Sequence, residues 1–491
     1  MPSPTDNRFL VVVFDALRPE FVTPDLMPNL TAFADGGVRY SDCHSNFLTE
    51  TRVNQTAVVT GCIPGRSGIV ANHMMASDVW PDRALNTGIE AQLAQAFADA
   101  DAKGGLIKVP TIGQRLTAAG KRYASLSAGT PGGGRLINHS AEADGTFRFA
   151  MRAPEASVPA GVLGEISASI GPMPEYVRPA TAWITWAVDA YLNWVETHIA
   201  PDVMLLWLCE PDETFHYHGI GSAQSLQTIR HADAEFGRIL AQQQDAIADG
   251  ALQIIAMSDH GQITLQGNPL DIPARLNEAG FRAAKAPGPD VDCVVIIHNG
   301  GGIWVRDDDP AMTEALVRFL LMQDWCGPIF TRHGTAGTLG LDEVCLNHPR
   351  APTIAITMRT NDGANANGRL GLTQHDAPYP VGGGCHGGLS RYELHNFMSM
   401  SGSAFKAGAV IDTPASNIDV TPTICTLLGL DIASECDGRF LSEAINGTPE
   451  TATAAGSETI VTSQNTVGPK TYLSFTEFAG VRYLNHAWVK P

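Results

Sequence analysis

Long apolar runs, paired cysteines and surplus basic charge are all missing from this sequence of 491 residues. No stretch approaches the roughly eighteen apolar residues that a membrane-spanning helix needs, so we expect no membrane span. The nine cysteines are scattered, odd in number and without a Cys-x-x-Cys pair, which gives no disulfide framework. The start, MPSPTDNRF, lacks a basic segment followed by a long apolar one, so we expect no secretory leader and predict a cytoplasmic location.

Basic residues are also scarce: 32 lysines and arginines face 51 aspartates and glutamates, and the formal net charge is -19. This balance argues against a nucleic-acid-binding surface and against attraction to anionic membranes. An anionic small molecule would therefore be drawn by locally bound metal rather than by the field of the whole protein. These totals leave the oligomeric state open, and a homo-oligomer is compatible with them.

Three short apolar runs have the character of buried strands, and metal-binding side chains follow each of them: FLVVVF, VMLLWL and ALQIIAM. Together with a histidine in the later loop GGGCHGG, these side chains are Asp15, Asp212, His216, Asp259, His260 and His386. Open α/β sheets bind ligands at the carboxyl ends of their strands, so we expect the carboxylate positions to lie at one edge. Three carboxylates and three imidazoles suit two borderline cations such as zinc.

The stretch from Phe47 to Asn72 supplies a candidate nucleophile, because Thr51 lies in a polar turn ahead of a short apolar segment. An alcohol is a poor nucleophile at neutral pH until a base or a metal activates it. Two metals close together clamp the attacking and leaving oxygens of a phosphoryl displacement. We expect a helix over residues 54–60, whose N-terminus would present backbone N–H groups to the phosphoryl group.

The ordered set of these residues resembles the alkaline phosphatase superfamily, and most closely its type I phosphodiesterase/nucleotide pyrophosphatase branch. The segment TGCIPGRSGIVAN matches that family's pattern TG-x-x-P-x-x-x-G-I-x-x-N. The resemblance implies that Thr51 attacks phosphorus and that Asn72 stabilises a phosphoryl oxygen. It departs from the family at Val53, Asn54 and Gln55, where Pro-Asn-His is common.

The same resemblance implies two Zn²⁺ ions, with other divalent metals such as Mn²⁺ as alternatives. It assigns one ion to Asp212, His216 and His386 and the other ion, which also binds the threonine oxygen, to Asp15, Asp259 and His260. His218 is a competing ligand, but the family spacing D-x-x-x-H favours His216. His44, His139 and His375 are expected to be ordinary surface or loop histidines.

These residues predict a metal-dependent hydrolase that cleaves nucleotide-type phosphodiester bonds through a phospho-threonine intermediate. The substrate would be a small-molecule phosphate or phosphonate ester, and phosphonate (phosphonoacetate-like) or phosphomonoester hydrolysis is the alternative. Arg52 and Arg135 are candidate substrate contacts, although either is also compatible with a structural or surface role. The glycine-rich loop around residues 129–135 would cradle an anion or form a flexible turn.

Two other functions are less compatible with the sequence. CIPGR at residues 62–66 matches the sulfatase pattern C-x-P-x-R, but it follows the Thr60-Gly61 pair instead of preceding one. The histidine-rich ligand set also suits zinc better than the oxygen-rich calcium site of a sulfatase. A binding protein without catalysis would be expected to have lost a ligand, and none is missing.

The resemblance implies an α/β fold of the alkaline phosphatase type, with a mostly parallel central sheet, helices on both faces and a small inserted α/β cap. We place the catalytic core at residues 1–265 and 350–447 and the cap at residues 266–349. Residues 448–491 would form a linker and C-terminal strands. Apolar periodicity predicts helices over residues 27–37, 179–198 and 225–244.

Overall fold

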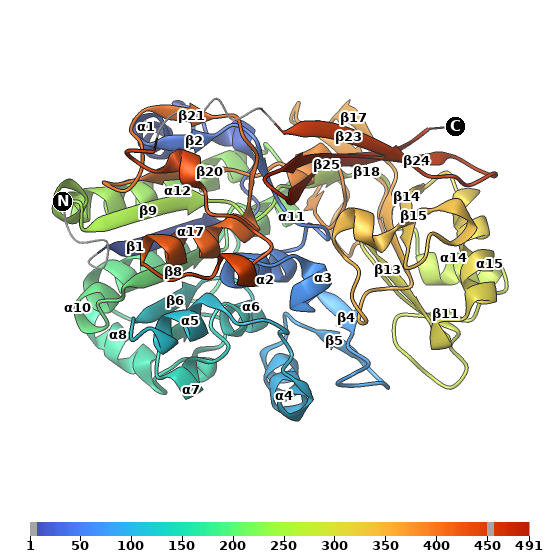
Figure 1. Cartoon of the computed structure of the whole chain (residues 1–491), viewed down its shortest axis with the longest axis horizontal. Coiled ribbons are helices and arrows are strands. Elements are labelled where there is room, and N and C mark those ends of the chain that lie inside the picture. Colours follow the sequence, from blue (N-terminus) through green and yellow to red (C-terminus); the bar gives the residue numbers. More distant parts are fainter. Residues whose placement is uncertain (1–6, 449–455, 491) are drawn as a thin grey trace.

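The computed structural model describes residues 7–448 and 456–490, and its largest element is an eight-stranded sheet (Figure 1). The strand order is β21-β2-β20-β9-β1-β8-β6-β7, and the five strands from β9 to β7 run parallel. The strands are β1 (Arg8–Phe14), β2 (Val38–Tyr40), β6 (Tyr123–Ser127), β7 (Phe147–Ala150), β8 (Val203–Leu208), β9 (Leu252–Met257), β20 (Met398–Ser401) and β21 (Ala409–Ile411).

Two separate cores cover the two faces of this sheet, because side chains alternate along each strand. In β1, Leu10, Val12 and Phe14 pack in one core, while Phe9, Val11 and Val13 pack in the other. The first core includes α1 (Pro28–Gly36), α9 (Thr181–Ala190) and α12 (Ala223–Gln242). The second includes α2 (Thr51–Thr60), α5 (Ile112–Ala118) and α17 (Val420–Leu427). Both faces are therefore buried, which accounts for the continuous apolar runs of the parallel strands.

The helices near the site differ from the sequence predictions mainly at their ends. The helix expected over residues 179–198 is α9, a π-helical turn at Tyr191–Val195 and α10 (Glu196–His198). The helix α12 starts after Ser222, whose hydroxyl accepts a hydrogen bond from the Ser225 amide as an N-cap. The helix expected over residues 54–60 begins one turn earlier, at Thr51.

A six-stranded sheet forms the other half of the molecule, at the right in Figure 1, in the order β11-β12-β13-β16-β14-β15. Its strands are β11 (Ala283–Ala284), β12 (Cys293–Ile297), β13 (Gly300–Val305), β14 (Cys326–Thr331), β15 (Leu339–Gly340) and β16 (Ile354–Met358). Two helices, α14 (Ile272–Glu278) and α15 (Pro310–Leu321), share its apolar core. The division at residue 349 stays a prediction, but β16 pairs antiparallel between β13 and β14 and lies in this sheet, not in the central one.

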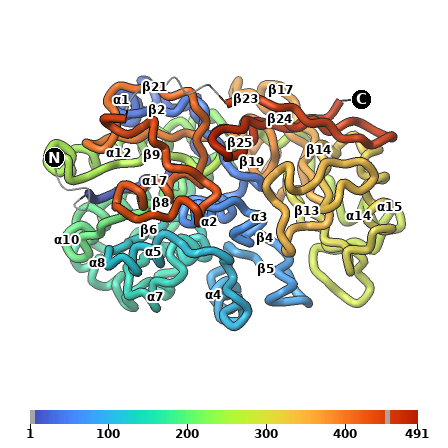
Figure 2. The backbone as a smooth tube through the Cα atoms, viewed as in Figure 1, coloured from blue at the N-terminus to red at the C-terminus, as the bar shows by residue number. Residues whose placement is uncertain are grey.

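The C-terminal residues form an antiparallel sheet of three strands: β23 (Ser457–Thr462), β24 (Lys470–Phe478) and β25 (Val481–Lys490). Figure 2 shows this segment running alongside β14. Leu473, Phe475 and Leu484 belong to the same apolar core as Phe330 of β14. The C-terminal strands thus add a layer to the smaller sheet. Within residues 7–448 and 456–490, no helix is both long and apolar enough to cross a bilayer.

Candidate active site

Two groups of three metal-binding side chains lie at the carboxyl edge of the central sheet. The inner group consists of Asp15, Asp259 and His260, and the outer group consists of Asp212, His216 and His386. Within each group the candidate ligand atoms lie within 4.8 Å of one another. The structure therefore brings together the six predicted ligands in the same two sets of three that the family resemblance implied.

The inner group is built from the ends of two neighbouring strands, since Asp15 follows β1 and Asp259 and His260 follow β9. His260 Nε2 lies 3.2 Å from Asp259 Oδ2 and 3.7 Å from Asp15 Oδ1. The second oxygen of each carboxylate is fixed: Trp207 Nε1 donates to Asp15 at 2.9 Å and the Ala16 amide to Asp259 at 3.0 Å. Neither oxygen that faces His260 accepts a hydrogen bond from the described part of the chain.

Burial shapes the charge state of the inner group, because Asp15 is 4% exposed and Asp259 is fully buried. Burial raises the pKa of Asp15 well above its usual range, and the nearby carboxylates of Asp259 and Asp212 raise it further. Burial also raises the pKa of Asp259, against the opposing effect of His260. Two buried carboxylates side by side are stable as anions only when a cation balances them.

The outer group has a different origin. Asp212 and His216 are one turn apart on α11 (Asp212–His218), and His386 follows β19 (Gly384–Cys385). Asp212 Oδ1 lies 3.2 Å from His216 Nε2 and 3.5 Å from His386 Nε2. Burial alone would raise the pKa of Asp212, but the neighbouring imidazoles bring it below its usual value. His218, the competing candidate, is exposed at the end of α11.

The strand β19 reaches the site through a four-stranded sheet of order β17-β18-β10-β19. The other strands of that sheet are β17 (Thr360–Ala364), β18 (Leu370–Thr373) and β10 (Ile263–Leu265). Because β10 starts shortly after His260 and pairs antiparallel with β19, it brings the His386 loop back to the edge of the central sheet.

All three candidate histidines are oriented in the same way. Their Nδ1 atoms contact backbone carbonyl oxygens: His216 with Gly384 at 2.8 Å, His260 with Gly261 at 3.0 Å and His386 with Thr49 at 3.0 Å. A carbonyl accepts, so Nδ1 carries the hydrogen and the lone pair of Nε2 faces the carboxylates. This arrangement is typical of metal-binding histidines. In the inner group the oxygens of Asp15 and Asp259 that face His260 are unpartnered in the described part of the chain, whereas Asp212 Oδ1 of the outer group also accepts a hydrogen bond from Gln262 Nε2. The two sets of imidazole and carboxylate ligands fit two divalent cations.

Thr51 is the first residue of α2 and its side chain is buried. Its Oγ1 lies 3.1 Å from His260 Nε2, which places the hydroxyl against the inner group. The preceding residue, Glu50, has extended backbone and forms the N-cap position of α2. The sequence analysis named Thr51 but missed Glu50, whose buried carboxylate accepts a hydrogen bond from the Asn72 amide.

Asn72 is held beside Thr51 by a fixed set of hydrogen bonds. Its Oδ1 accepts from the Arg52 amide at 2.9 Å, and its carbonyl accepts from the Thr87 amide at 2.9 Å and the Thr87 hydroxyl at 2.7 Å. With Oδ1 engaged by an N–H donor, Nδ2 remains as the donor of that amide toward the cavity. Asn72 lines that cavity together with Thr51.

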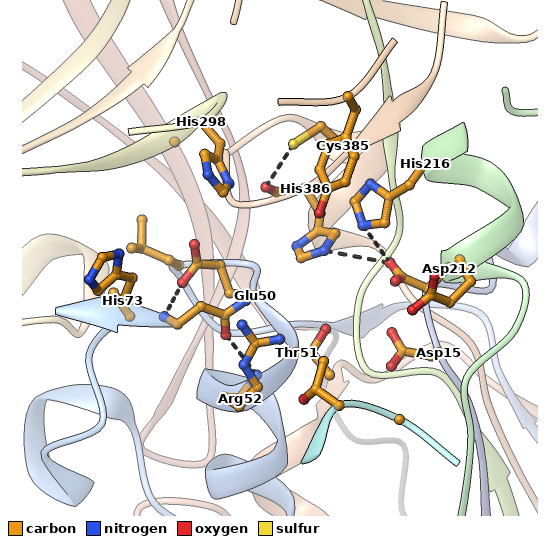
Figure 3. Close-up of a pocket in the computed structure, with 18 of the residues that line it drawn as sticks. Asp15, Glu50, Thr51, Arg52, His73, Asp212, His216, His298, Cys385 and His386 are labelled. Carbon is orange, nitrogen blue, oxygen red and sulfur yellow. Dashed lines mark hydrogen bonds and ion pairs between the residues drawn. The ribbon is translucent and has the colours of Figure 1, made fainter. Parts of the chain in front are cut away.

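A cavity of about 230 Å³ is lined by Asp15 of the inner group and by all three residues of the outer group. Figure 3 shows Asp15, Thr51, Asp212, His216 and His386 around it. The smaller sheet supplies one wall through Ile296, His298, Gly300 and Gly301. This wall lies close to the His386 loop, since a Cβ added to Gly300 would lie 1.9 Å from the Gly387 carbonyl oxygen.

Several lining residues carry no local sequence signal and were missed, namely Glu50, His73, Arg178, Glu213, Tyr217, His298 and Tyr379. Tyr379 stacks on His216 with ring centroids 3.9 Å apart. Burial lowers the pKa of His298 to about 4, so this imidazole is neutral at pH 7.

The two arginines suggested as substrate contacts occupy different places. Arg52 lines the cavity, and its Nε atom has no hydrogen-bond partner within the described ranges. Arg135, on α6 (Pro131–Leu136), contacts Glu90 at 2.6 Å and Glu142 at 3.4 Å and is not among the residues that line the cavity. Its loop reaches the cavity through Gly129 and Thr130 instead.

Comparison with known proteins gives concordant results. The family model described as type I phosphodiesterase/nucleotide pyrophosphatase matches residues 9–311. The venom phosphodiesterase of Naja atra is 23% identical over 269 residues, covering 54% of this chain and 27% of that protein. Ectonucleotide pyrophosphatase/phosphodiesterase family member 1 of Mus musculus is 23% identical over 257 residues, covering 51% and 24%. The chain therefore spans about a quarter of the length of these curated relatives.

A solved structure shows the same fold. Murine ectonucleotide pyrophosphatase/phosphodiesterase 5, as an inactive variant in complex with AMP, superimposes with a TM-score of 0.58 at 18% sequence identity. The match covers 86% of this chain and 95% of the murine one. It confirms the predicted fold class, an α/β structure of the alkaline phosphatase type.

Proposed function

The chain belongs to the type I phosphodiesterase/nucleotide pyrophosphatase family, and we propose that it hydrolyses nucleotide-type phosphodiester bonds with Thr51 as the nucleophile. The observation that carries this proposal is the position of the Thr51 hydroxyl, 3.1 Å from His260 in a cavity lined by candidate metal ligands. Buried clusters of carboxylates and imidazoles with shifted pKa values are typical of functional sites, and a hydroxyl in contact with such a cluster is a candidate nucleophile.

The inner and outer groups would each hold one divalent cation, and zinc suits their mixture of imidazole and carboxylate ligands. When bound, two such cations lower the pKa of the threonine hydroxyl and neutralise charge on the phosphoryl oxygens. The hydrogen bonds from Trp207 to Asp15 and from the Ala16 amide to Asp259 hold the inner carboxylates in place for this role.

The reaction would proceed in two displacements. First, the Thr51 hydroxyl releases its proton to solvent and Oγ1 forms a bond to phosphorus, while the bond to the leaving oxygen breaks and that oxygen takes up a proton from solvent, giving a phospho-threonine and an alcohol. Second, a water molecule releases a proton to solvent and attacks phosphorus, and the Thr51 oxygen leaves and takes up a proton. Asn72 Nδ2 would donate a hydrogen bond to a nonbridging oxygen in both transition states, which is the electrostatic contribution of an oxyanion site.

The charges around the cavity favour a diester over a monoester. Of the two arginines that line it, Arg178 pairs with Glu213 at 2.9 Å, whereas Arg52 forms no ion pair with any residue that the structure describes. A phosphodiester carries one negative charge and a monoester close to two near neutral pH, so a diester needs less cationic compensation from side chains. Tyr217, which lines the cavity near the outer group and is 39% exposed, would supply an aromatic surface for a base, whereas the Tyr379 ring already stacks on His216.

The test is a rate comparison on zinc-loaded protein with bis-p-nitrophenyl phosphate, p-nitrophenyl phosphate and a p-nitrophenyl phosphonate monoester. We expect the diester to be the fastest of the three. A clear preference for the monoester or the phosphonate would overturn the diester assignment while leaving the metal site in place. Activity that persists after complete removal of metal would overturn the metal-dependent mechanism itself.

A further inference from the structure

A third group of metal-binding side chains lies outside the active site, and it consists of Asp42, His44 and His395. Its ligand atoms also lie within 4.8 Å of one another. His44 was expected to be a surface or loop histidine, but it is 1% exposed, on β3 (Cys43–His44). His395 directly follows α16 (Arg391–Leu394).

The backbone holds the two histidines against each other. His44 and His395 form an antiparallel β-bridge, and their rings meet edge to face with centroids 5.0 Å apart. Hydrogen bonds on both sides reinforce this bridge, from the Ser45 amide to the Leu394 carbonyl at 2.7 Å and from the Asn396 amide to the Cys43 carbonyl at 3.0 Å. These backbone hydrogen bonds therefore fix the positions of the two imidazoles relative to each other.

His44 repeats the orientation of the three active-site histidines. Its Nδ1 lies 2.9 Å from the Leu484 carbonyl oxygen, so Nδ1 carries a hydrogen, and in the neutral imidazole the lone pair is on Nε2. Asp42 Oδ1 lies 2.8 Å from that Nε2. The geometry is nevertheless not that of a hydrogen bond, and this buried Nε2 has no hydrogen-bond partner in residues 7–448 and 456–490.

An imidazole lone pair and a carboxylate oxygen repel each other at this distance unless a proton or a metal ion lies between them, and the absence of hydrogen-bond geometry favours the metal ion. Asp42 is partly exposed, with 32% of its side chain accessible, so an ion and a coordinated water can reach the group from solvent. Two imidazoles and one carboxylate with an open position form a common ligand set for zinc. In a tetrahedral zinc site, ligand atoms lie about 3.3 Å apart given bond lengths near 2 Å, so small side-chain rotations suffice.

We propose that Asp42, His44 and His395 bind a third divalent cation of the zinc type, which serves a structural role. The ion would join three segments that are far apart in sequence: the chain just before Thr51, the chain just after the His386 loop, and β25 through the Leu484 carbonyl that orients His44. It would thereby hold the C-terminal sheet against the segments that carry the nucleophile and an outer-group histidine.

The first test is metal content per chain, measured by mass spectrometry after zinc loading and gel filtration into metal-free buffer. Wild-type protein is expected to retain three equivalents, and His395→Ala and the nearly isosteric Asp42→Asn are each expected to lose one. His486→Ala is the matched control, because His486 is a half-buried histidine of β25 outside the group, and it should keep all three. Retention of the same metal content by wild type and His395→Ala would overturn the proposal.

A second measurement separates this site from the catalytic one. The double variant Asp212→Ala/Asp259→Ala disrupts both active-site groups and should retain one zinc equivalent, which the further change His395→Ala removes. Zinc should also raise the thermal midpoint of the double variant but not of the triple variant. No bound zinc in the double variant, or NMR evidence that wild-type His44 is an imidazolium paired with Asp42 in zinc-loaded protein, would rule the site out even if the diesterase activity is confirmed.

Discussion

The inner and outer groups contain the same kinds of side chain in opposite proportions. The inner group has two carboxylates and one imidazole at the ends of β1 and β9, whereas the outer group has one carboxylate and two imidazoles on α11 and the loop after β19. The pKa values of Asp15 and Asp259 are raised, chiefly by burial, while imidazoles lower that of Asp212. The inner group therefore has less internal compensation of its charge, from His260 alone, and depends on a bound cation more than the outer group does.

Replacing the nucleophile should have the largest effect. We expect Thr51→Ala to lower kcat/KM by about 10⁴-fold or more, since loss of a covalent nucleophile removes the whole displacement pathway. The variant should retain both active-site metals, because the three carboxylate and imidazole ligands of each group remain. Metal content and diesterase rate measured on the same sample check this, with Thr51→Ser as the control that keeps a hydroxyl. A fully metal-loaded Thr51→Ala protein with wild-type rate would exclude the phospho-threonine intermediate.

The change Asp15→Asn tests the charge argument directly. Without metal, removing one of the buried carboxylates should stabilise the fold by about 1 kcal/mol, because their mutual repulsion decreases while an oxygen remains to accept from Trp207. With metal, the same variant should be less stable than wild type, because it loses a ligand and the binding energy that goes with it. Denaturant unfolding in chelator and in zinc measures this crossover.

A matched variant of the outer group is Asp212→Asn, for which no gain in metal-free stability is expected. Although burial opposes its charge, His216 has a raised pKa beside Asp212 and compensates that carboxylate. If Asp212→Asn stabilises the metal-free protein as much as Asp15→Asn does, the proposed difference between the two groups is incorrect.

Removing an outer-group imidazole should lower the diesterase rate by less than removing the nucleophile. We expect His386→Ala to lower the diesterase rate by about 10²-fold or more, because the cation of the outer group would be bound weakly or lost. The His386→Ala variant should keep its inner cation. In wild-type protein, a chelator should remove the two cations in two phases, with the outer cation released first. Stopped-flow release of zinc to a chromogenic chelator, compared between wild type and His386→Ala, provides the measurement. Release of both zinc ions from wild-type protein in a single phase would contradict the proposed difference between the inner and outer groups.

Arg52 should contribute less than any ligand. Its guanidinium lines the cavity without an ion-pair partner in the described residues, so a hydrogen bond to a phosphoryl oxygen is its expected role. Loss of one charge-assisted hydrogen bond costs about 1.5–3 kcal/mol, so Arg52→Ala should lower kcat/KM by roughly 10- to 100-fold. Arg52→Lys, which keeps the charge but not the planar fork, should recover part of this loss. An unchanged rate in Arg52→Ala would limit Arg52 to a structural role.

Local sequence patterns were sufficient for the parts of the site that follow buried strands. Asp15, Asp259 and Asp212 could be predicted because each follows a continuous apolar run, and the parallel sheet places those run ends at one edge. His386 needed the family resemblance, since a glycine-rich loop gives no sign of where it returns. The smaller sheet was predicted as an insertion that ends at residue 349. The structure shows that β16, beyond that boundary, pairs with β13 and β14, and sequence periodicity does not indicate which strands pair.

His44 shows why burial was hard to predict for isolated polar residues. Its two-residue strand has no periodicity, and its partners Leu484 and His395 lie far along the chain. The predicted cytoplasmic location and the possible homo-oligomer stay predictions, as do the assigned roles of the site residues. The relatives compared above include a venom phosphodiesterase, so family membership alone does not determine the compartment.

The smallest effect on catalysis is expected at Arg135, which extends the comparison to a residue outside both groups. Its guanidinium and the Glu90 carboxylate are each about 15% exposed and 2.6 Å apart, and this pair joins α6 to α4 (Glu90–Ala100). Arg135→Ala should therefore change the diesterase rate by less than about twofold but destabilise the fold by about 1–2 kcal/mol, as expected for a partly buried ion pair. Glu90→Gln should have a similar effect on stability, and the double variant should destabilise by less than the sum, because the two residues act as one pair. A large loss of activity in Arg135→Ala with unchanged stability would instead mean that the glycine-rich loop moves this arginine into the cavity when substrate binds.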